Sequence, residues 1–271
     1  MWRPPISAPE ESEDETQMKV ESRQVGALWV HIYETRAELG AAAAADTAAR
    51  LRGIIEKNGA ANVIFAAAPS QNELLAGLLE ADVEWTRVRA FHMDEYIGID
   101  ADEPAGFGNF LDRAIFTKLP FMERHYLRCE TGDAREKCDA YAALLKKYPP
   151  DIVLLGIGEN GHLAFNDPAE ADFNDPLMIK IVDLDEVCRR QQVNDGCFAR
   201  IEDVPRQAIT MTMSCLMKVP EAVCAVPGAR KADAVYGTLL GPVSTRCPAS
   251  ILRQHGNAAL YLDVDSASRV L

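Results

Sequence analysis

The chain has 271 residues, 48% of them apolar, so it can bury the core of one α/β domain of ordinary size. Its formal charge of −13 excludes a broad basic face, and with it nucleic acid or an anionic membrane as a general partner. The seven cysteines lack the paired spacing of a zinc site, and no apolar run has the length of a membrane span or secretion signal. We therefore expect reduced thiols and a cytoplasmic protein.

The N-terminal segment differs in composition from the rest of the chain. Residues 1–22 combine three prolines with an acidic run and have too few apolar residues to offset the entropy of ordering. This composition predicts a flexible acidic tail, followed by a single domain over residues 23–271. A regulatory or partner-binding arm is the alternative interpretation of the tail.

Strand-like and helix-like segments alternate along the remaining chain. Strands are predicted over residues 26–34, 61–68, 87–93, 152–155, 208–219, 222–228 and 258–265. Helices are predicted over residues 35–57, 70–79, 106–119, 133–148 and 231–240, with Ser70 and Glu73 at the spacing of a capping box. This alternation predicts an α/β fold: a doubly wound, mostly parallel sheet with helices on both faces.

One long segment breaks this pattern. Residues 169–205 are polar and acidic, and they have no strong period. A long irregular segment next to a site is typical of a lid, so we predict a lid over these residues. A surface insertion without a function is the alternative.

The string DIVLLGIGENGHLAFNDP, residues 151–168, joins an apolar run to glycines and then to polar residues. Its first part suits a strand buried on both faces, and the glycines allow a sharp turn at the carboxyl end of that strand. Ligands bind at this end of parallel sheets, which makes Asn160, His162 and Asp167 candidate site residues. A loop histidine without a function and a turn aspartate before Pro168 are the ordinary alternatives.

A second string, RVRAFHMDEYIGI at residues 87–99, also ends an apolar segment with polar side chains. Asp94 is the first carboxylate after that segment. A turn cap or a partner for a surface cation is the ordinary role of such a residue. Together, the two strings place a carboxylate and a histidine at the ends of two predicted strands.

FHMDEYIGI and GIGENGHLAFNDP resemble the glucosamine-6-phosphate deaminase (isomerase) family, and so do PGARKADAV at 227–235 and CPASIL at 247–252. The resemblance implies a Rossmann-like deaminase/isomerase fold and conversion of an amino-sugar phosphate to a ketose phosphate with loss of ammonia, without metal or cofactor. It makes Asp94 the base that takes the C2 proton and His162 the acid/base of ring opening, oriented by Asn160 and Asp167. At the last of these positions the family usually has a longer glutamate.

The resemblance also implies residues that hold the substrate phosphate. Lys231 matches the family's phosphate lysine, although a solvated surface lysine is the ordinary reading. The usual Thr-Gly-Gly type loop is replaced by AAAPSQNE at 66–73, where the candidates are Pro69, Ser70 and Gln71. Gln191 stands where the family often has an arginine, which leaves the preceding Arg189 and Arg190 as candidates.

Two other functions remain open at this point. A 6-phosphogluconolactonase shares the family's architecture and a similar glycine-rich histidine turn. A sugar-phosphate sensor without turnover is the second alternative, because the phosphate loop and Asp167 depart from the family pattern. In each case the partner is a small sugar phosphate, and a homo-oligomer stays open.

Overall fold

The computed structural model describes residues 19–130 and 132–271, and an eight-stranded sheet runs through their centre. The strand order is β1-β2-β11-β10-β7-β3-β4-β6. β1 is antiparallel to β2, and every other neighbouring pair in this sheet is parallel. The strands are β1 Lys19–Val25, β2 Leu28–Tyr33, β3 Ala61–Phe65, β4 Val88–His92, β6 Glu123–His125, β7 Ile152–Leu155, β10 Glu221–Val226 and β11 Ala258–Asp263.

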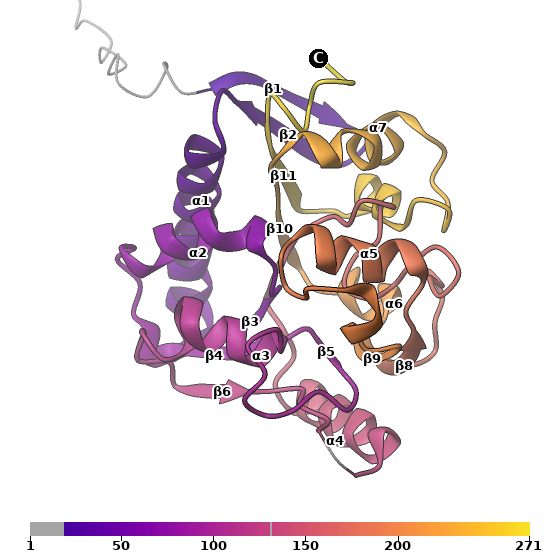
Figure 1. Ribbon diagram of the computed structural model, residues 1–271. Coiled ribbons are helices and arrows are strands. Elements are labelled where there is room, and N and C mark those ends of the chain that lie inside the picture. The colour runs from indigo at the N-terminus through magenta and orange to yellow at the C-terminus, as the bar shows by residue number, and fades with distance from the viewer. Residues whose placement is uncertain (1–18, 131) are drawn as a thin grey trace, which may run out of the picture.

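Helices cover both faces of this sheet (Figure 1). In β3, for example, Val63 and Phe65 point to a core shared with α1 and α2, whereas Ile64 points to a second core shared with α4 and α7. The mostly parallel, doubly wound fold predicted from the sequence is thereby confirmed. The helices are α1 Arg36–Asn58, α2 Asn72–Leu79, α3 Phe107–Leu111, α4 Ala134–Lys147, α5 Glu186–Asn194, α6 Met213–Leu216 and α7 Ala232–Leu240.

The first helix shows why the sequence prediction worked where local signals were strong. Thr35 and Glu38 form a reciprocal capping box at its start, and Gly59 ends it in the left-handed region at φ 81°. Its small residues let α2 approach closely, since a side chain at Gly40 would meet the Cβ of Glu73 at 2.2 Å. The helix predicted over residues 35–57 is confirmed.

Two predicted elements differ from the structure for identifiable reasons. The capping box at Ser70 is wrong: Pro69–Gln71 forms a 3₁₀ turn before α2, and Glu73 instead pairs with Arg36 at 2.6 Å. The strand predicted over 208–219 stops after β9, Gln207–Met211, because the Thr212 side chain accepts the N–H of Cys215 and starts α6.

A small antiparallel sheet that the sequence did not predict lies beside the main one. It has the order β5-β9-β8, where β5 is Asp94–Tyr96 and β8 is Ile179–Asp183. The segment predicted as a lid, 169–205, contains β8 and α5. Of the tail predicted over residues 1–22, residues 1–18 lie outside the described residues. Residues 19–22 belong to β1, where they pair with β2, so the predicted tail boundary is wrong.

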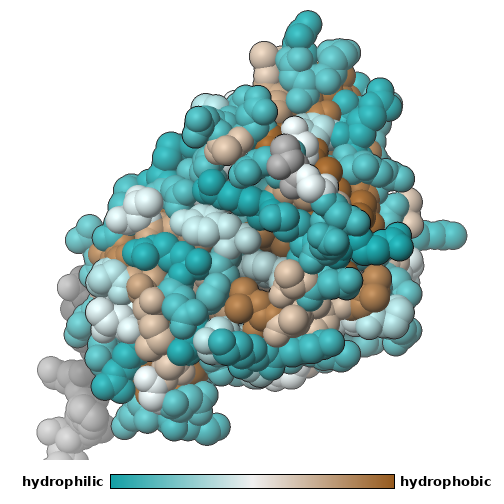
Figure 2. All heavy atoms as spheres, turned by 90° about the horizontal axis from the view of Figure 1, so that it is seen from below, coloured by the Kyte–Doolittle hydropathy of each residue, from teal (hydrophilic) through white to brown (hydrophobic). Residues whose placement is uncertain are grey.

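The surface and the cysteines fit the composition. The face seen from below is largely hydrophilic, and hydrophobic residues reach it only in patches (Figure 2). All seven cysteines are free thiols. Within the described ranges, no helix combines the length and apolar character needed to cross a membrane.

Candidate active site

A cleft opens at the carboxyl ends of four neighbouring strands, β10, β7, β3 and β4. From β3 the chain proceeds outward through β4 and β6, and from β7 it proceeds the other way through β10 and β11. The cleft therefore lies where the winding direction changes, which is where open α/β sheets bind ligands. The residues lining it are Ala66, Ala67, Ala68, Ser70, Met93, Asp94, Phe107, Gly156, Ile157, Gly158, His162, Ala164, Phe165, Gln191, Gln192, Asp195 and Lys231.

Asp94 lies on one wall of this cleft, at the start of β5. Its side chain is 4% exposed, and its carboxylate accepts no hydrogen bond from the described residues. Burial, and after it the neighbouring charge of Glu95, raises the pKa of Asp94 well above its usual range. An unpaired carboxylate of raised pKa that faces a cleft has the properties of a general base.

His162 also lines this cleft, in the turn that follows β7. Its Nδ1 is 2.9 Å from Oδ1 of Asp167, and its backbone N–H donates to Asn160 at 3.0 Å. The side-chain amide of Asn160 donates in turn to Asp167 at 2.9 Å. The shorter carboxylate therefore comes within ion-pair distance of the imidazole directly, without hydrogen-bond geometry at Nδ1.

Asp167 is fully buried and has further partners on α5. The Asp185 N–H lies 3.4 Å from its Oδ2, and the Cys188 Sγ lies within 4.8 Å of the same carboxylate. Burial alone would raise the pKa of Asp167, but hydrogen bonds and charge from His162, with Asn160 and the Asp185 N–H, outweigh it and lower the pKa. Asp167 is thus held as an anion.

The His162, Asp167 and Cys188 ligand atoms lie within 4.8 Å of one another, as those of a metal site would. Burial raises the pKa of Cys188 well above its usual range, so the sulfur stays a protonated thiol. A metal ligand would have to be the thiolate.

Glycines shape the turn that carries His162. A Cβ at Gly158 would lie 2.2 Å from the His162 ring, so only glycine leaves room for the imidazole. Gly161 has φ 85°, in the left-handed region, and its carbonyl accepts the N–H of Ala249 at 2.8 Å. This is the sharp turn that the glycine-rich string predicted.

Lys231 lies at another part of the cleft, at the end of a 3₁₀ turn that follows β10. Asp263, at the end of β11, fixes this turn by accepting the Gly228 N–H at 3.0 and 2.9 Å. The Lys231 side chain is buried, and its ammonium takes no hydrogen bond or ion pair in the described part of the chain. Burial lowers the pKa of Lys231, with Asp195 and Glu159 opposing the shift.

The loop after β3 contributes unequally. Ser70 lines the cleft, while Pro69 lines a neighbouring hollow. Gln71 does not line the cleft: its side-chain amide donates to the Ser70 hydroxyl at 3.2 Å and to the Ala225 carbonyl at 3.1 Å. Gln71 thus supports the loop from below.

The two arginine candidates lie away from the cleft. Arg189 donates to the Ile201 and Val204 carbonyls, and Arg190 is exposed and paired with Glu186. Neither arginine lines the cleft, and the following residue of α5, Gln191, does. Gln191 accepts the Glu159 N–H at 2.8 Å, which ties α5 to the histidine turn.

Sequence reasoning missed several residues of the walls. Phe107 and Phe165 stack with their ring centroids 5.2 Å apart, and Gln192 and Asp195 reach the cleft from α5 and its end. The Asp185 N-cap, whose side chain accepts the Cys188 N–H at 2.7 Å, is a local signal that would have located α5. The two phenylalanines carry no local signal, since their stacking joins distant segments.

A mostly parallel sheet whose switch-point cleft is lined by Asp94, His162 and Lys231 is the arrangement of an α/β enzyme. The chain belongs to the family described as glucosamine-6-phosphate isomerases/6-phosphogluconolactonase, whose model matches residues 34–261. The resemblance noted in the sequence is confirmed.

Individual relatives are similar to most of the chain. The glucosamine-6-phosphate deaminase of Listeria innocua is 36% identical over 219 residues, which is 79% of this chain and 92% of the relative. A structure described as a monomeric glucosamine-6-phosphate deaminase matches with TM-score 0.81 and 26% identity, over 89% of this chain and 99% of that one. The 6-phosphogluconolactonase of Trypanosoma brucei shares the fold, with TM-score 0.74 and 18% identity over 93% and 100% of the two chains.

Proposed function

We propose that the chain is a glucosamine-6-phosphate deaminase, which converts glucosamine 6-phosphate and water to fructose 6-phosphate and ammonia. The observation that carries the proposal is that two groups line one cleft. One is Asp94, which is buried and accepts no hydrogen bond from the described residues, and the other is His162, which contacts Asp167. The reaction needs two different proton carriers, one at carbon and one at oxygen. The deaminase identities of the sequence relatives support the same reaction.

The steps follow from the roles of these residues. His162 moves the proton between the anomeric hydroxyl and the ring oxygen, which opens the ring to the aldehyde. Asp94 takes the proton from C2, and the resulting enolamine accepts a proton at C1 to give an imine at C2. Water adds to this imine, and ammonia leaves, so that the ketone of fructose 6-phosphate remains.

The anionic end of the substrate is assigned to Lys231 and Ser70. A buried ammonium without a partner gains a charge-assisted bond when a phosphate arrives. Residues 169–205 are proposed as the lid of the single domain, because α5 reaches the cleft through Gln191 and Gln192. Arg189 and Arg190 are not needed for this assignment.

The lactonase alternative lacks a specific observation in its favour. Hydrolysis of a lactone removes no proton from carbon and needs one base to activate water, so it does not call for both Asp94 and His162. The lactonase structures share the fold at 15–20% identity, whereas the sequence relatives named as deaminases reach 32–37%.

Turnover by the purified protein decides among these functions. Glucosamine 6-phosphate should yield ammonia and fructose 6-phosphate in equal amounts, and a 6-phosphogluconolactone should hydrolyse no faster than it does without protein. Lactone hydrolysis without ammonia release would establish the lactonase. Binding of glucosamine 6-phosphate without either reaction would establish a sensor.

A further inference from the structure

Next to Asp94 on β5 lies a second buried carboxylate, Glu95, to which the reaction assigns no role. Successive side chains of a strand point to opposite sides, so Glu95 points away from the cleft that Asp94 lines. It is 2% exposed. Two adjacent carboxylates buried together are costly, which calls for a physical reason at this position.

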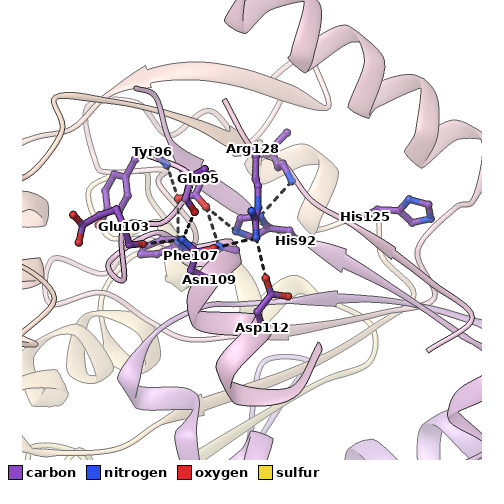
Figure 3. A network of polar contacts seen from close by, with 12 residues as sticks. His92, Glu95, Tyr96, Glu103, Phe107, Asn109, Asp112, His125 and Arg128 are labelled. Carbon is purple, nitrogen blue, oxygen red and sulfur yellow. Dashed lines mark hydrogen bonds and ion pairs between the residues drawn. The ribbon is translucent and has the colours of Figure 1, made fainter. Parts of the chain in front are cut away.

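Glu95 accepts three backbone N–H groups (Figure 3). Its Oε1 accepts those of Tyr96 and Phe107, each at 3.0 Å, and its Oε2 accepts that of Gly108 at 2.8 Å. The last two are the first N–H groups of α3, and the residue before them, Gly106, has no side chain to cap the helix. Glu95 therefore caps α3 from another strand.

This cap determines a wall of the cleft. Phe107 lines the cleft and stacks on Phe165, with the ring planes 12° apart. Phe165 belongs to the turn that also carries His162. Through the Phe107 backbone, Glu95 thus connects the strand of the base with the turn of the histidine.

Burial raises the pKa of Glu95, and the three backbone N–H groups and Arg128 oppose this shift in favour of the carboxylate form. Glu95 accepts N–H groups on both oxygens and donates to none of the described residues, a pattern that favours the carboxylate form. Arg128, held by Asp112 at 2.9 Å, adds positive potential. His92, 3.9 Å away, is neutral, because burial lowers its pKa to about 3.

We propose that Glu95 is a positioning residue for the proposed deaminase reaction: its carboxylate holds Phe107 in the wall of the cleft and keeps a negative charge next to Asp94. That charge makes Asp94 a stronger base, as the second cause of its raised pKa after burial. Two further titratable groups interact electrostatically with Asp94. They are Tyr96, on the same strand, and Cys188, on α5. His162 and Lys231 share the cleft with Asp94.

The test is Glu95→Gln, which keeps the shape and one acceptor oxygen but removes the charge. The acid limb of the pH profile of kcat/KM should move to lower pH by about half a unit or more, and kcat should fall about tenfold. KM should change less than about twofold, because Glu95 does not touch substrate. The matched control is Glu103→Gln, since Glu103 accepts the Ala105 N–H at 3.3 Å in the same loop (Figure 3). An unmoved limb in Glu95→Gln, or an equal shift in the control, overturns the proposal.

If Glu95→Gln does not fold, Glu95→Asp replaces it. The retained charge should leave the acid limb at its wild-type pH, while the shorter side chain should lower kcat because it cannot reach both N–H groups of α3. Wild-type kcat in Glu95→Asp overturns the proposal.

A carboxyl titration by NMR separates this proposal from the proposed function. The Asp94 signal of the protein without substrate should titrate at lower pH in Glu95→Gln than in wild type. Wild-type protein that does not turn over glucosamine 6-phosphate refutes the proposed function alone. An Asp94 titration that is the same in both proteins refutes the role of Glu95.

Discussion

Two buried aspartates, Asp94 in the lining of the cleft and Asp167 next to His162, are in opposite electrostatic states. On the β5 wall, Asp94 has no hydrogen-bond partner in the described residues and a raised pKa. Next to His162, Asp167 is buried too, but His162, Asn160 and the Asp185 N–H outweigh burial and lower its pKa. The same side chain is thus prepared at one position to take a proton and at the other to remain an anion that orients a histidine.

The largest expected effect comes from removing the base. Asp94→Asn should lower kcat by about 10³-fold or more, measured as fructose 6-phosphate formation. Because folding raises the pKa of Asp94, the charged form costs stability as the pH rises above the unfolded value. Asp94→Asn should therefore melt at the wild-type temperature or higher at pH 7, and this difference should vanish below pH 3.8. A variant that loses activity because it unfolds would contradict the assignment.

Displacing the histidine without changing its chemistry tests the role of His162. Gly158→Ala places a Cβ 2.2 Å from the ring, and the displaced imidazole should cost about 100-fold in kcat. The matched control is Gly53→Ala in α1, where a Cβ would meet nothing within 4 Å and helix propensity favours alanine. Equal activity of the two variants would show that the position of His162 does not matter.

Neutralising the orienting anion should have a smaller effect on rate and a characteristic effect on stability. Asp167→Asn should lower kcat about tenfold, since the amide cannot hold His162 as the carboxylate does. Because folding lowers the pKa of Asp167, its contribution to stability is present above pH 3.8 and is lost as the pH falls through the folded-state value. Thermal melts should separate wild type from the variant at pH 7 and converge in acid. A constant difference over this range would contradict the anion.

The smallest effect on kcat is expected at the anionic end of the cleft. Lys231→Met removes the cation but keeps most of the apolar stem, so KM should rise about tenfold while kcat changes little. Arg190→Met is the control, because Arg190 is exposed and paired with Glu186 outside the cleft. If steady-state kinetics show that Arg190→Met raises KM as much as Lys231→Met does, the assignment of the phosphate to Lys231 is contradicted and Arg190 becomes a phosphate-binding candidate again.

The elements and site residues that sequence reasoning found are those with local signals. Thr35 and Gly59 mark the two ends of α1 through contacts with residues a few positions away in the chain. The glycines around His162 likewise indicate a tight turn from the local sequence alone. The apolar run of β7 identifies a strand buried on both faces without knowledge of its neighbours. For this reason the sheet and the two strings with Asp94 and His162 were predictable.

The remainder depends on contacts between distant segments. β5 has only three residues and exists because it pairs with β9, more than a hundred residues later. Glu73 forms an ion pair with Arg36 of the neighbouring helix and does not form the predicted capping box with Ser70. Likewise, Gln191 of α5 lines the cleft, whereas Arg189 donates to the Ile201 and Val204 carbonyls. Packing determines this orientation of α5, and the polar sequence of the segment does not predict it.

The most direct test follows deuterium at C2 of glucosamine 6-phosphate labelled at that carbon. Wild-type protein should move the label off C2, either to water or to C1 of the product, whereas Asp94→Asn should leave it in place while His162 still opens the ring. Ring opening is followed separately, by trapping the free aldehyde. Loss of the C2 label in Asp94→Asn at the wild-type rate would contradict the central claim that Asp94 is the base.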